Sequence, residues 1–100
     1  MTRIYLDDIR KPDYGCVQFY SVNDAMGYIR RMYKMGNTDF YLDLDHDAGD
    51  YVSKGGDYIK LLDWLEETGR NYPIRIHSMN PVGVENMRRI IQRNNWMEVK

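Results

Sequence analysis

Residues 40–47 read Phe-Tyr-Leu-Asp-Leu-Asp-His-Asp. The mainly apolar first part, residues 40–44, predicts a β-strand, and the polar residues after it mark where the strand ends. Asp43 stands inside this strand, an unfavourable place for an aspartate. Alternation along a strand places Asp43 and Asp45 on the same side. Exposure on an edge strand would explain Asp43, whereas on a central strand Asp43 would need a partner.

Helical patterns flank this strand, which favours a central position. Three helices are expected: one capped by Ser21 and ended by Gly36, one from Ile59 to Gly69, and one opened by the N-cap pair Asn80-Pro81. Four further strands are expected over residues 3–6, 16–20, 74–77 and 96–99. Strands alternating with helices predict an α/β fold with three layers, in which a mostly parallel five-stranded sheet carries helices on its faces.

The composition limits the class of protein. A chain of 100 residues with 43% hydrophobic residues is expected to form a single domain, residues 1–100, with a core of its own. One cysteine, Cys16, excludes an intrachain disulfide framework and a Cys-rich zinc site. Apolar runs are too short for a membrane span or a secretory signal, so a cytoplasmic location without membrane contact is expected. The net charge of −1 argues against an extended nucleic-acid-binding surface.

Polar residues gather where the predicted strands end. Three short polar segments, residues 7–8, 45–47 and 77–80, each follow a strand, and both histidines of the chain lie in them. In open α/β sheets, ligands bind at the carboxyl ends of the strands. The sequence therefore predicts one ligand site at this edge of the sheet. The oligomeric state of the protein is left open.

The carboxylates of this edge have two interpretations. Asp7 and Asp8 could cap a loop and pair with Arg10 or Lys11, or they could hold a cation or a substrate, since adjacent like charges are unfavourable without a counter-charge. Asp45, at the end of its strand, is expected to belong to the site. Candidate carboxylates that could be either structural or functional are Asp43 and Asp47.

The two histidines, His46 and His77, suggest acid–base chemistry. A single histidine near a core is usually structural, but two at neighbouring strand ends can serve as a proton acceptor and a proton donor near neutral pH. Nearby carboxylates could orient each ring. The alternative chemistry is a metal site made of the two histidines and one aspartate.

The start of the third predicted helix is a candidate phosphate site. The free amides and dipole of a helix N-terminus attract phosphate, and Ser78, Asn80 and Gly83 lie there. Arg10 could bind phosphate in a bidentate way, or it could pair with Asp8. A plain Asn cap, with Ser78 bonded to the backbone, is the structural alternative.

Four motifs together resemble the cyclic-phosphate-processing receiver-like domains, which are divergent relatives of the response-regulator receiver. They read Leu-Asp-Asp-Ile-Arg-Lys-Pro at residues 6–12, Leu-Asp-His-Asp-Ala-Gly at 44–49, Gly-Asp-Tyr at 56–58 and His-Ser-Met-Asn-Pro-Val-Gly at 77–83. The resemblance spans about residues 4–91. It implies a receiver-like, flavodoxin-like sheet with strand order 2-1-3-4-5. The receiver's first helix is reduced or missing here, since about nine residues join the first two strands.

The resemblance also implies roles for individual residues. Asp7 and Asp8 match the receiver's acidic pair, which with Asp45 would hold a divalent cation such as Mg²⁺, and Asp45 matches the phosphate-accepting aspartate. Ser78 matches the hydroxyl residue after the fourth strand. The family's added histidines, matched by His46 and His77, suggest phosphoester chemistry in place of signalling.

The combined expectation is a phosphoesterase-like enzyme that processes a cyclic phosphate on a nucleotide or an RNA end. His46, His77 and Asp45 would be catalytic, and Arg10, Ser78, Asn80 and Gly83 would hold the phosphorylated ligand. Two alternatives remain. One is a non-catalytic module that binds a nucleotide or a protein, and the other is a signalling domain phosphorylated at Asp45.

Overall fold

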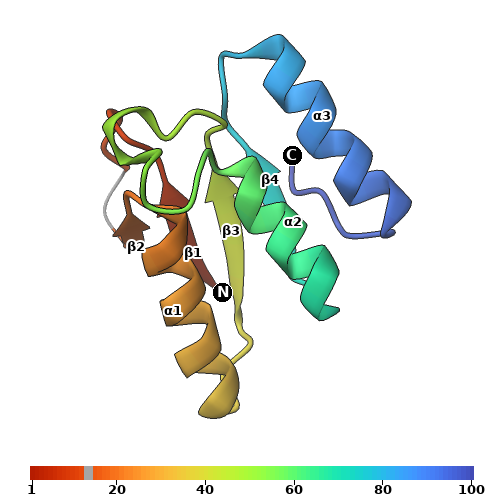
Figure 1. Ribbon diagram of the computed structural model, residues 1–100. Coiled ribbons are helices and arrows are strands. Elements are labelled where there is room, and N and C mark those ends of the chain that lie inside the picture. The colour runs from red at the N-terminus through yellow and green to blue at the C-terminus, as the bar shows by residue number, and fades with distance from the viewer. Residues whose placement is uncertain (13–14) are drawn as a thin grey trace.

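The computed structural model describes residues 1–12 and 15–100. Along the chain it contains the following elements (Figure 1): β1 (Thr2–Leu6), β2 (Cys16–Phe19), α1 (Val22–Lys34), β3 (Phe40–Leu44), a 3₁₀ turn η1 (Gly49–Tyr51), α2 (Ile59–Thr68), β4 (Ile74–Ile76) and α3 (Pro81–Arg93). The three expected helices and the first four expected strands are thus confirmed.

The sheet has the strand order β2-β1-β3-β4, and all of its strands pair in parallel. The expected fifth strand is not confirmed. The segment 96–99 lies beside β4 but forms only an isolated parallel bridge between Ile74 and Glu98. Two backbone hydrogen bonds hold it, from Ile74 N to Met97 O at 2.9 Å and from Val99 N to Ile74 O at 2.7 Å. The receiver-like order is therefore present over four strands.

The helices lie on one face of the sheet. A single core cluster joins Ile4, Leu42 and Ile74 of the strands to buried residues of α1, α2 and α3. Figure 1 shows α1 and α2 over the same side of the sheet. The expectation of three layers, with helices on both faces, is wrong for the described residues.

The direction of the connections explains why two layers form. From β2 to β3 and from β3 to β4 the chain advances in the same direction across the sheet, so right-handed crossovers place their helices on the same face. Only the connection from β1 to β2 runs the opposite way. Its described residues, 7–12 and 15, contain no helix, which agrees with the expected reduction of the first receiver helix.

Two predicted caps position the helices. The Ser21 hydroxyl accepts a hydrogen bond from Asp24 N at 3.2 Å and begins α1. The Asn80 Oδ1 accepts one from Gly83 N at 3.0 Å and begins α3, with Pro81 at its first position. These bonds satisfy amides that the first turn of a helix leaves unpaired. They fix the start of α3 beside the end of β4.

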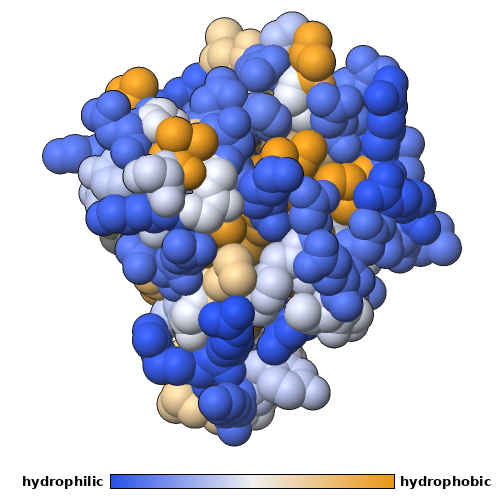
Figure 2. Space-filling model, viewed as in Figure 1, coloured by the Kyte–Doolittle hydropathy of each residue, from blue (hydrophilic) through white to orange (hydrophobic). Residues whose placement is uncertain are grey.

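Strand alternation gives the helix-free face a polar character. Arg3, Tyr5, Asp43, Arg75 and His77 alternate with the apolar core positions of their strands and so point to the other side. Figure 2, viewed as Figure 1, draws the opposite, helix-bearing side, which is mostly hydrophilic with separate hydrophobic areas. Among the described residues, no helix combines the length and the apolar character that a membrane crossing requires.

Candidate functional site

Three carboxylates meet at the carboxyl ends of β1 and β3. Oxygen atoms of Asp7, Asp8 and Asp45 lie within 4.8 Å of one another. Burial raises the pKa of Asp8, and the negative charges of Asp7, Asp45 and the nearby Asp47 raise it further. The crowding of negative charge that the sequence predicted is therefore present.

Asp7 is the most buried of the three carboxylates, with 1% of its surface exposed. Its Oδ1 accepts hydrogen bonds from the backbone of Ile9 at 2.9 Å and of Arg10 at 2.8 Å. Its Oδ2 lies 3.0 Å from Nε2 of His77. The carboxylate thus caps the loop after β1, as the structural interpretation proposed, and also contacts one of the two histidines.

His77 lies between two aspartates. Its Nδ1 is 2.6 Å from Oδ1 of Asp43, its Nε2 faces Asp7, and 9% of its side chain is exposed. A carboxylate is an acceptor, so only the doubly protonated imidazolium can donate to both partners. The ring of His77 thus links Asp43 to Asp7.

Asp43 is fully buried on the helix-free face of the sheet. Besides His77, it receives a hydrogen bond from Arg75 Nη1 at 3.0 Å, and Arg3 Nε lies 3.5 Å away. Burial by itself would raise the pKa of Asp43, but the His77 hydrogen bond and the charges of His77 and Arg75 bring that pKa below its usual value. Asp43 therefore has the partners that a buried carboxylate in a central strand requires.

His46 belongs to a different set of contacts. Its Nδ1 lies 2.7 Å from Oδ1 of Asp47, and 15% of its side chain is exposed. Its ring packs against Gly83, where an added Cβ would overlap it. The first turn of α3 can approach His46 because position 83 has no side chain.

Asp57 completes a second cluster of potential ligands. Atoms of His46, Asp47 and Asp57 lie within 4.8 Å of one another. Asp57 Oδ1 also accepts a hydrogen bond from Ala48 N at 2.9 Å, which closes the loop that follows β3. Asp57 was not predicted as a site residue, although its position just before Tyr58, the N-cap of α2, is a signal that could have marked it.

The structure thus distributes the expected site residues over two adjacent groups. His77 contacts Asp7 and Asp43, whereas His46 contacts Asp47. Among the described residues, no contact between the two imidazole rings is found. His46 also adjoins the carboxylate cluster, because its backbone N donates to Asp45 Oδ1 at 2.7 Å.

The candidate phosphate ligands surround the end of β4. Arg10 Nη1 donates to the carbonyl oxygen of His77 at 3.1 Å, which holds this exposed arginine over the strand end. Ser78 Oγ accepts from Asn80 N at 3.1 Å, and the Asn80 side chain caps α3. Ser78 and Asn80 therefore have the partners of the structural alternative, a helix cap and a backbone contact, whereas Arg10 contacts the His77 carbonyl in place of the expected Asp8.

Three residues of the helix-free face were not expected near the site. Tyr5 stacks on His77, and Arg3 and Arg75 contact Asp43. Strand alternation already placed Tyr5 and Arg3 on one side of β1. Their proximity to His77 could not be inferred without the register between the strands.

Comparison with known protein families identifies the chain. The family model of the cyclic-phosphate processing receiver domain matches residues 2–93. The chain belongs to this family. This cyclic-phosphate processing receiver domain keeps the receiver-like parallel sheet with its carboxylates at the strand ends. Searches of curated proteins and of solved structures found no match.

The carboxylate cluster of this receiver domain has the donor set that suits Mg²⁺. Hard oxygen ligands are preferred by this ion, and Asp7, Asp8 and Asp45 supply them within a short span. Burial, and after it the charges of Asp7, Asp45 and Asp47, raise the pKa of Asp8, so a cation in the cluster would favour its ionised form. The residues therefore fit a divalent cation, which could be held by these three side chains.

Proposed function

We propose that this receiver domain hydrolyses a cyclic phosphate ester at the carboxyl edge of its sheet. The observation that carries the proposal is the chain of contacts Asp43–His77–Asp7, which brings an imidazole to a cluster of carboxylates. Membership of a family that processes cyclic phosphates supports the same reaction class. In this proposal the two histidines divide the proton transfers between them.

His46 is proposed as the general base. When Nδ1 carries a proton and donates it to Asp47, Nε2 has a free lone pair that can accept a proton from water. The carboxylate also orients the ring, as an aspartate does for the histidine of a catalytic triad. Packing against Gly83 restricts the ring further.

His77 is proposed as the general acid. Asp43 holds the proton on Nδ1, and the second proton on Nε2 points toward Asp7 at the edge of the carboxylate cluster. This second proton is the one that can pass to a leaving oxygen. Asp43 is then a positioning residue, because it acts on the substrate only through His77.

The proposed reaction balances without a further reagent. A water oxygen attacks phosphorus, and His46 takes the proton of that water. One phosphorus–oxygen bond of the ring breaks, and the leaving oxygen takes a proton from His77. The product is an acyclic phosphomonoester that carries a free hydroxyl group, and proton exchange with solvent restores both histidines.

The charge of the phosphate needs positive partners. Arg10 stands over the end of β4, and the first turn of α3 offers its positive dipole end beside Ser78 and Asn80. Mg²⁺ held by the three carboxylates would add neutralisation of the phosphate oxygens. In its absence, Asp7, Asp8 and Asp45 would repel the phosphate.

The test uses a panel of nucleoside 2′,3′-cyclic phosphates and nucleoside 3′,5′-cyclic phosphates, with and without Mg²⁺. We expect release of a phosphomonoester, and we expect His46→Ala and His77→Ala each to lower the rate by about 10²–10⁴-fold. Arg93→Ala, which removes an exposed residue paired with Glu66, serves as the control and should leave the rate unchanged.

Three outcomes would contradict the assignment. Full turnover in either histidine variant would exclude that histidine from proton transfer. Binding of a cyclic nucleotide without any turnover would favour the non-catalytic binding module, and phosphorylation of Asp45 by a small phosphodonor would favour the signalling role.

A further inference from the structure

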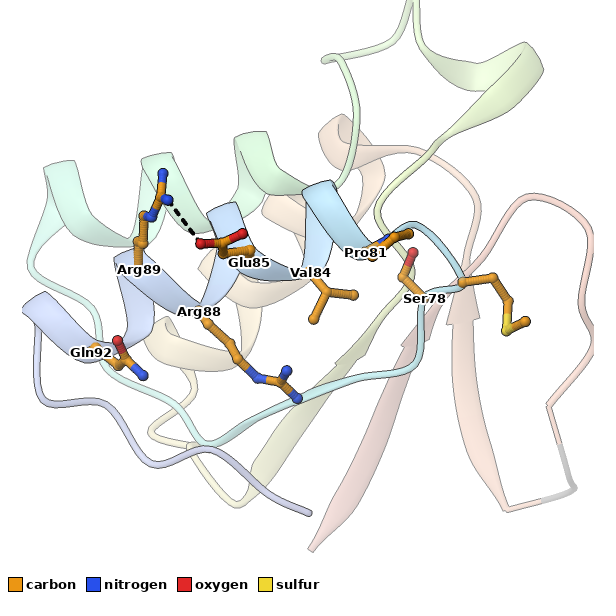
Figure 3. A pocket seen from close by; sticks show the side chains of 8 residues that line it. Ser78, Pro81, Val84, Glu85, Arg88, Arg89 and Gln92 are labelled. Atoms are coloured by element: carbon orange, nitrogen blue, oxygen red, sulfur yellow. Dashed lines mark hydrogen bonds and ion pairs between the residues drawn. The ribbon is translucent and has the colours of Figure 1, made fainter.

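A hollow of the described residues lies beside the proposed site. It is a groove of about 670 Å³ that begins at Ser78 and runs along α3 (Figure 3). Ser78 directly follows His77, so the groove opens where the phosphate is proposed to bind. The residues that line it include Ser78, Met79, Pro81, Val84, Arg88 and Gln92.

The lining is mixed, with three apolar residues and five polar or charged ones. Met79, Pro81 and Val84 supply the apolar part near Ser78. The polar groups further along the helix come from Arg88, Gln92 and the ion pair of Glu85 with Arg89. Small-molecule sites have volumes of about 300–1,000 Å³ and use such polar groups to orient the ligand against apolar walls. The groove is therefore suited in size and chemistry to a ligand larger than a phosphate group alone.

Arg88 is held in place at this groove. Figure 3 shows Arg88 and Val84 projecting from the same side of α3. The Arg88 Nε donates to Glu98 Oε2 at 2.9 Å, and the Glu98 side chain is only 14% exposed. A guanidinium fixed through Nε keeps its planar face and its terminal nitrogens for a ligand, and such faces stack on nucleobases.

The other hollows lie far from this chemistry. Cavities of about 370 Å³ and 250 Å³ are lined by Gly69, Arg70 and Asn71, at the opposite ends of β3 and β4 from the proposed site. Neither is lined by Ser78 or any other residue of the segment after β4. The groove along α3 is thus the hollow that continues from the proposed phosphate site.

We propose that this groove binds the nucleoside part of the substrate, with the base beside Arg88 and Val84 and the phosphate beside Ser78. The inference rests on the proposed function and narrows the substrate class to nucleotide cyclic phosphates. A cyclic phosphate without a nucleoside would leave the groove unused. Stacking of a base on such a platform contributes about 1–3 kcal/mol, which corresponds to an affinity gain of roughly 5–150-fold.

The experiment compares two phosphomonoesters by NMR titration of the ¹⁵N-labelled protein. Adenosine 3′-phosphate carries a nucleoside, and glycerol 2-phosphate does not. We expect adenosine 3′-phosphate to bind at least about tenfold more tightly and to shift the amide signals of Val84, Arg88 and Gln92. Glycerol 2-phosphate should shift only signals near Ser78.

Matched variants on α3 separate the groove from a general effect of charge. Arg88→Ala and Val84→Glu should each lower the ratio of the affinity for adenosine 3′-phosphate to that for glycerol 2-phosphate by about fivefold or more. After Arg88→Ala, the affinity for glycerol 2-phosphate itself should stay unchanged. Arg93→Ala removes a charge from the same helix outside the groove and should leave both affinities unchanged. An unchanged amide spectrum confirms that each variant is folded.

The results distinguish this inference from the proposed function. Equal affinity for the two ligands, binding of neither, or binding without shifts along α3 would overturn the nucleoside groove, whatever the turnover assay gives. The protein could also show no turnover, while adenosine 3′-phosphate shifts amide signals along α3 and Arg88→Ala reduces those shifts. That result would support the nucleoside groove and overturn only the hydrolytic function.

Discussion

The imidazole of His77 lies flat on the ring of Tyr5, with ring centroids 4.5 Å apart and planes inclined by 6°. The Arg3 guanidinium lies over the same tyrosine, 5.4 Å from its centroid. β1 and β4 are not neighbours in the sheet, because β3 separates them. The stacked side chains therefore bridge β3 and cover a sheet face on which the described chain places no helix.

Loss of the tyrosine ring should weaken this cover. We expect Tyr5→Leu to lower the free energy of unfolding by about 1–3 kcal/mol, because both the stack on His77 and the area buried by the ring are lost. Tyr5→Phe keeps the ring and should change that free energy by less than about 1 kcal/mol. Urea unfolding measures both. Equal losses for the two variants would show that stacking is not the stabilising contact.

Removal of the Asp43 charge should be strongly destabilising near neutral pH. In Asp43→Asn, the guanidinium of Arg75 loses its buried counter-charge and His77 loses its carboxylate partner, at a cost of about 3 kcal/mol. Urea unfolding measures this loss. Asp63→Asn, which removes an exposed carboxylate 3.8 Å from Lys60, is the control and should cost less than about 1 kcal/mol.

The pH dependence of the Asp43 effect follows from the direction of its pKa. Because the folded-state pKa is lowered, the stabilisation is complete above the unfolded-state value of about 3.9 and is lost as the pH falls through the folded-state pKa. The difference between wild type and Asp43→Asn should therefore shrink as the pH falls from about 5 toward 2. A difference that grows on acidification would contradict this assignment.

Asp8 should behave in the opposite way. Its raised pKa means that the ionised Asp8 carboxylate lowers the stability of the folded protein. The full stability is present below the unfolded-state pKa, and part of it is lost as the pH rises through the folded-state pKa. Asp8→Asn should therefore stabilise the protein by about 0.5–1 kcal/mol near pH 7, a small amount because solvent screens this charge. The same substitution should have no stabilising effect near pH 3. Thermal unfolding without divalent cations measures the change.

The same variant tests the cation site. We expect Mg²⁺ to raise the melting temperature of the wild type, since a ligand that binds only the folded state stabilises it, and to raise that of Asp8→Asn much less. Asp39→Asn, at the start of β3 and far from the cluster, should respond to Mg²⁺ like the wild type. Equal Mg²⁺ responses in all three proteins would exclude Asp8 as a ligand.

Two glycines located in helices give a matched comparison. Gly83→Ala would place a Cβ against the His46 ring, so we expect the ring to leave Asp47 and the hydrolytic rate to fall by about tenfold or more. Gly27→Ala in α1 meets no neighbouring atom and should stabilise the protein by about 0.5–1 kcal/mol without a change in rate. Unchanged turnover in Gly83→Ala would show that the position of His46 is unimportant.

Much of the architecture could be predicted from local sequence signals. A mainly apolar run ended by polar residues predicted the strand Phe40–Leu44, and capping residues predicted where α1 and α3 begin. These signals depend on residues within one turn or one strand, so they are readable without tertiary contacts. The motifs at the strand ends likewise predicted the family that the chain matches.

The number of layers and the number of strands could not be predicted from local sequence signals. The alternation of strands and helices is equally consistent with helices on one face or on both, and only the direction of each crossover decides between them. Segment 96–99 has the composition of a strand, yet it pairs with β4 only at Ile74. Pairing depends on a partner strand, which local pattern does not specify.

The functional site likewise has features that follow from the sequence alone and features that depend on the tertiary structure. The sequence by itself determined that carboxylates, both histidines and a helix start would gather at one edge, because parallel strands end on the same side. Only the tertiary structure decided that His77 contacts Asp7 and Asp43, and that His46 contacts Asp47. Asp43 and Asp7 are 34 and 70 residues from His77, and their approach depends on strand register and packing, which no local pattern encodes.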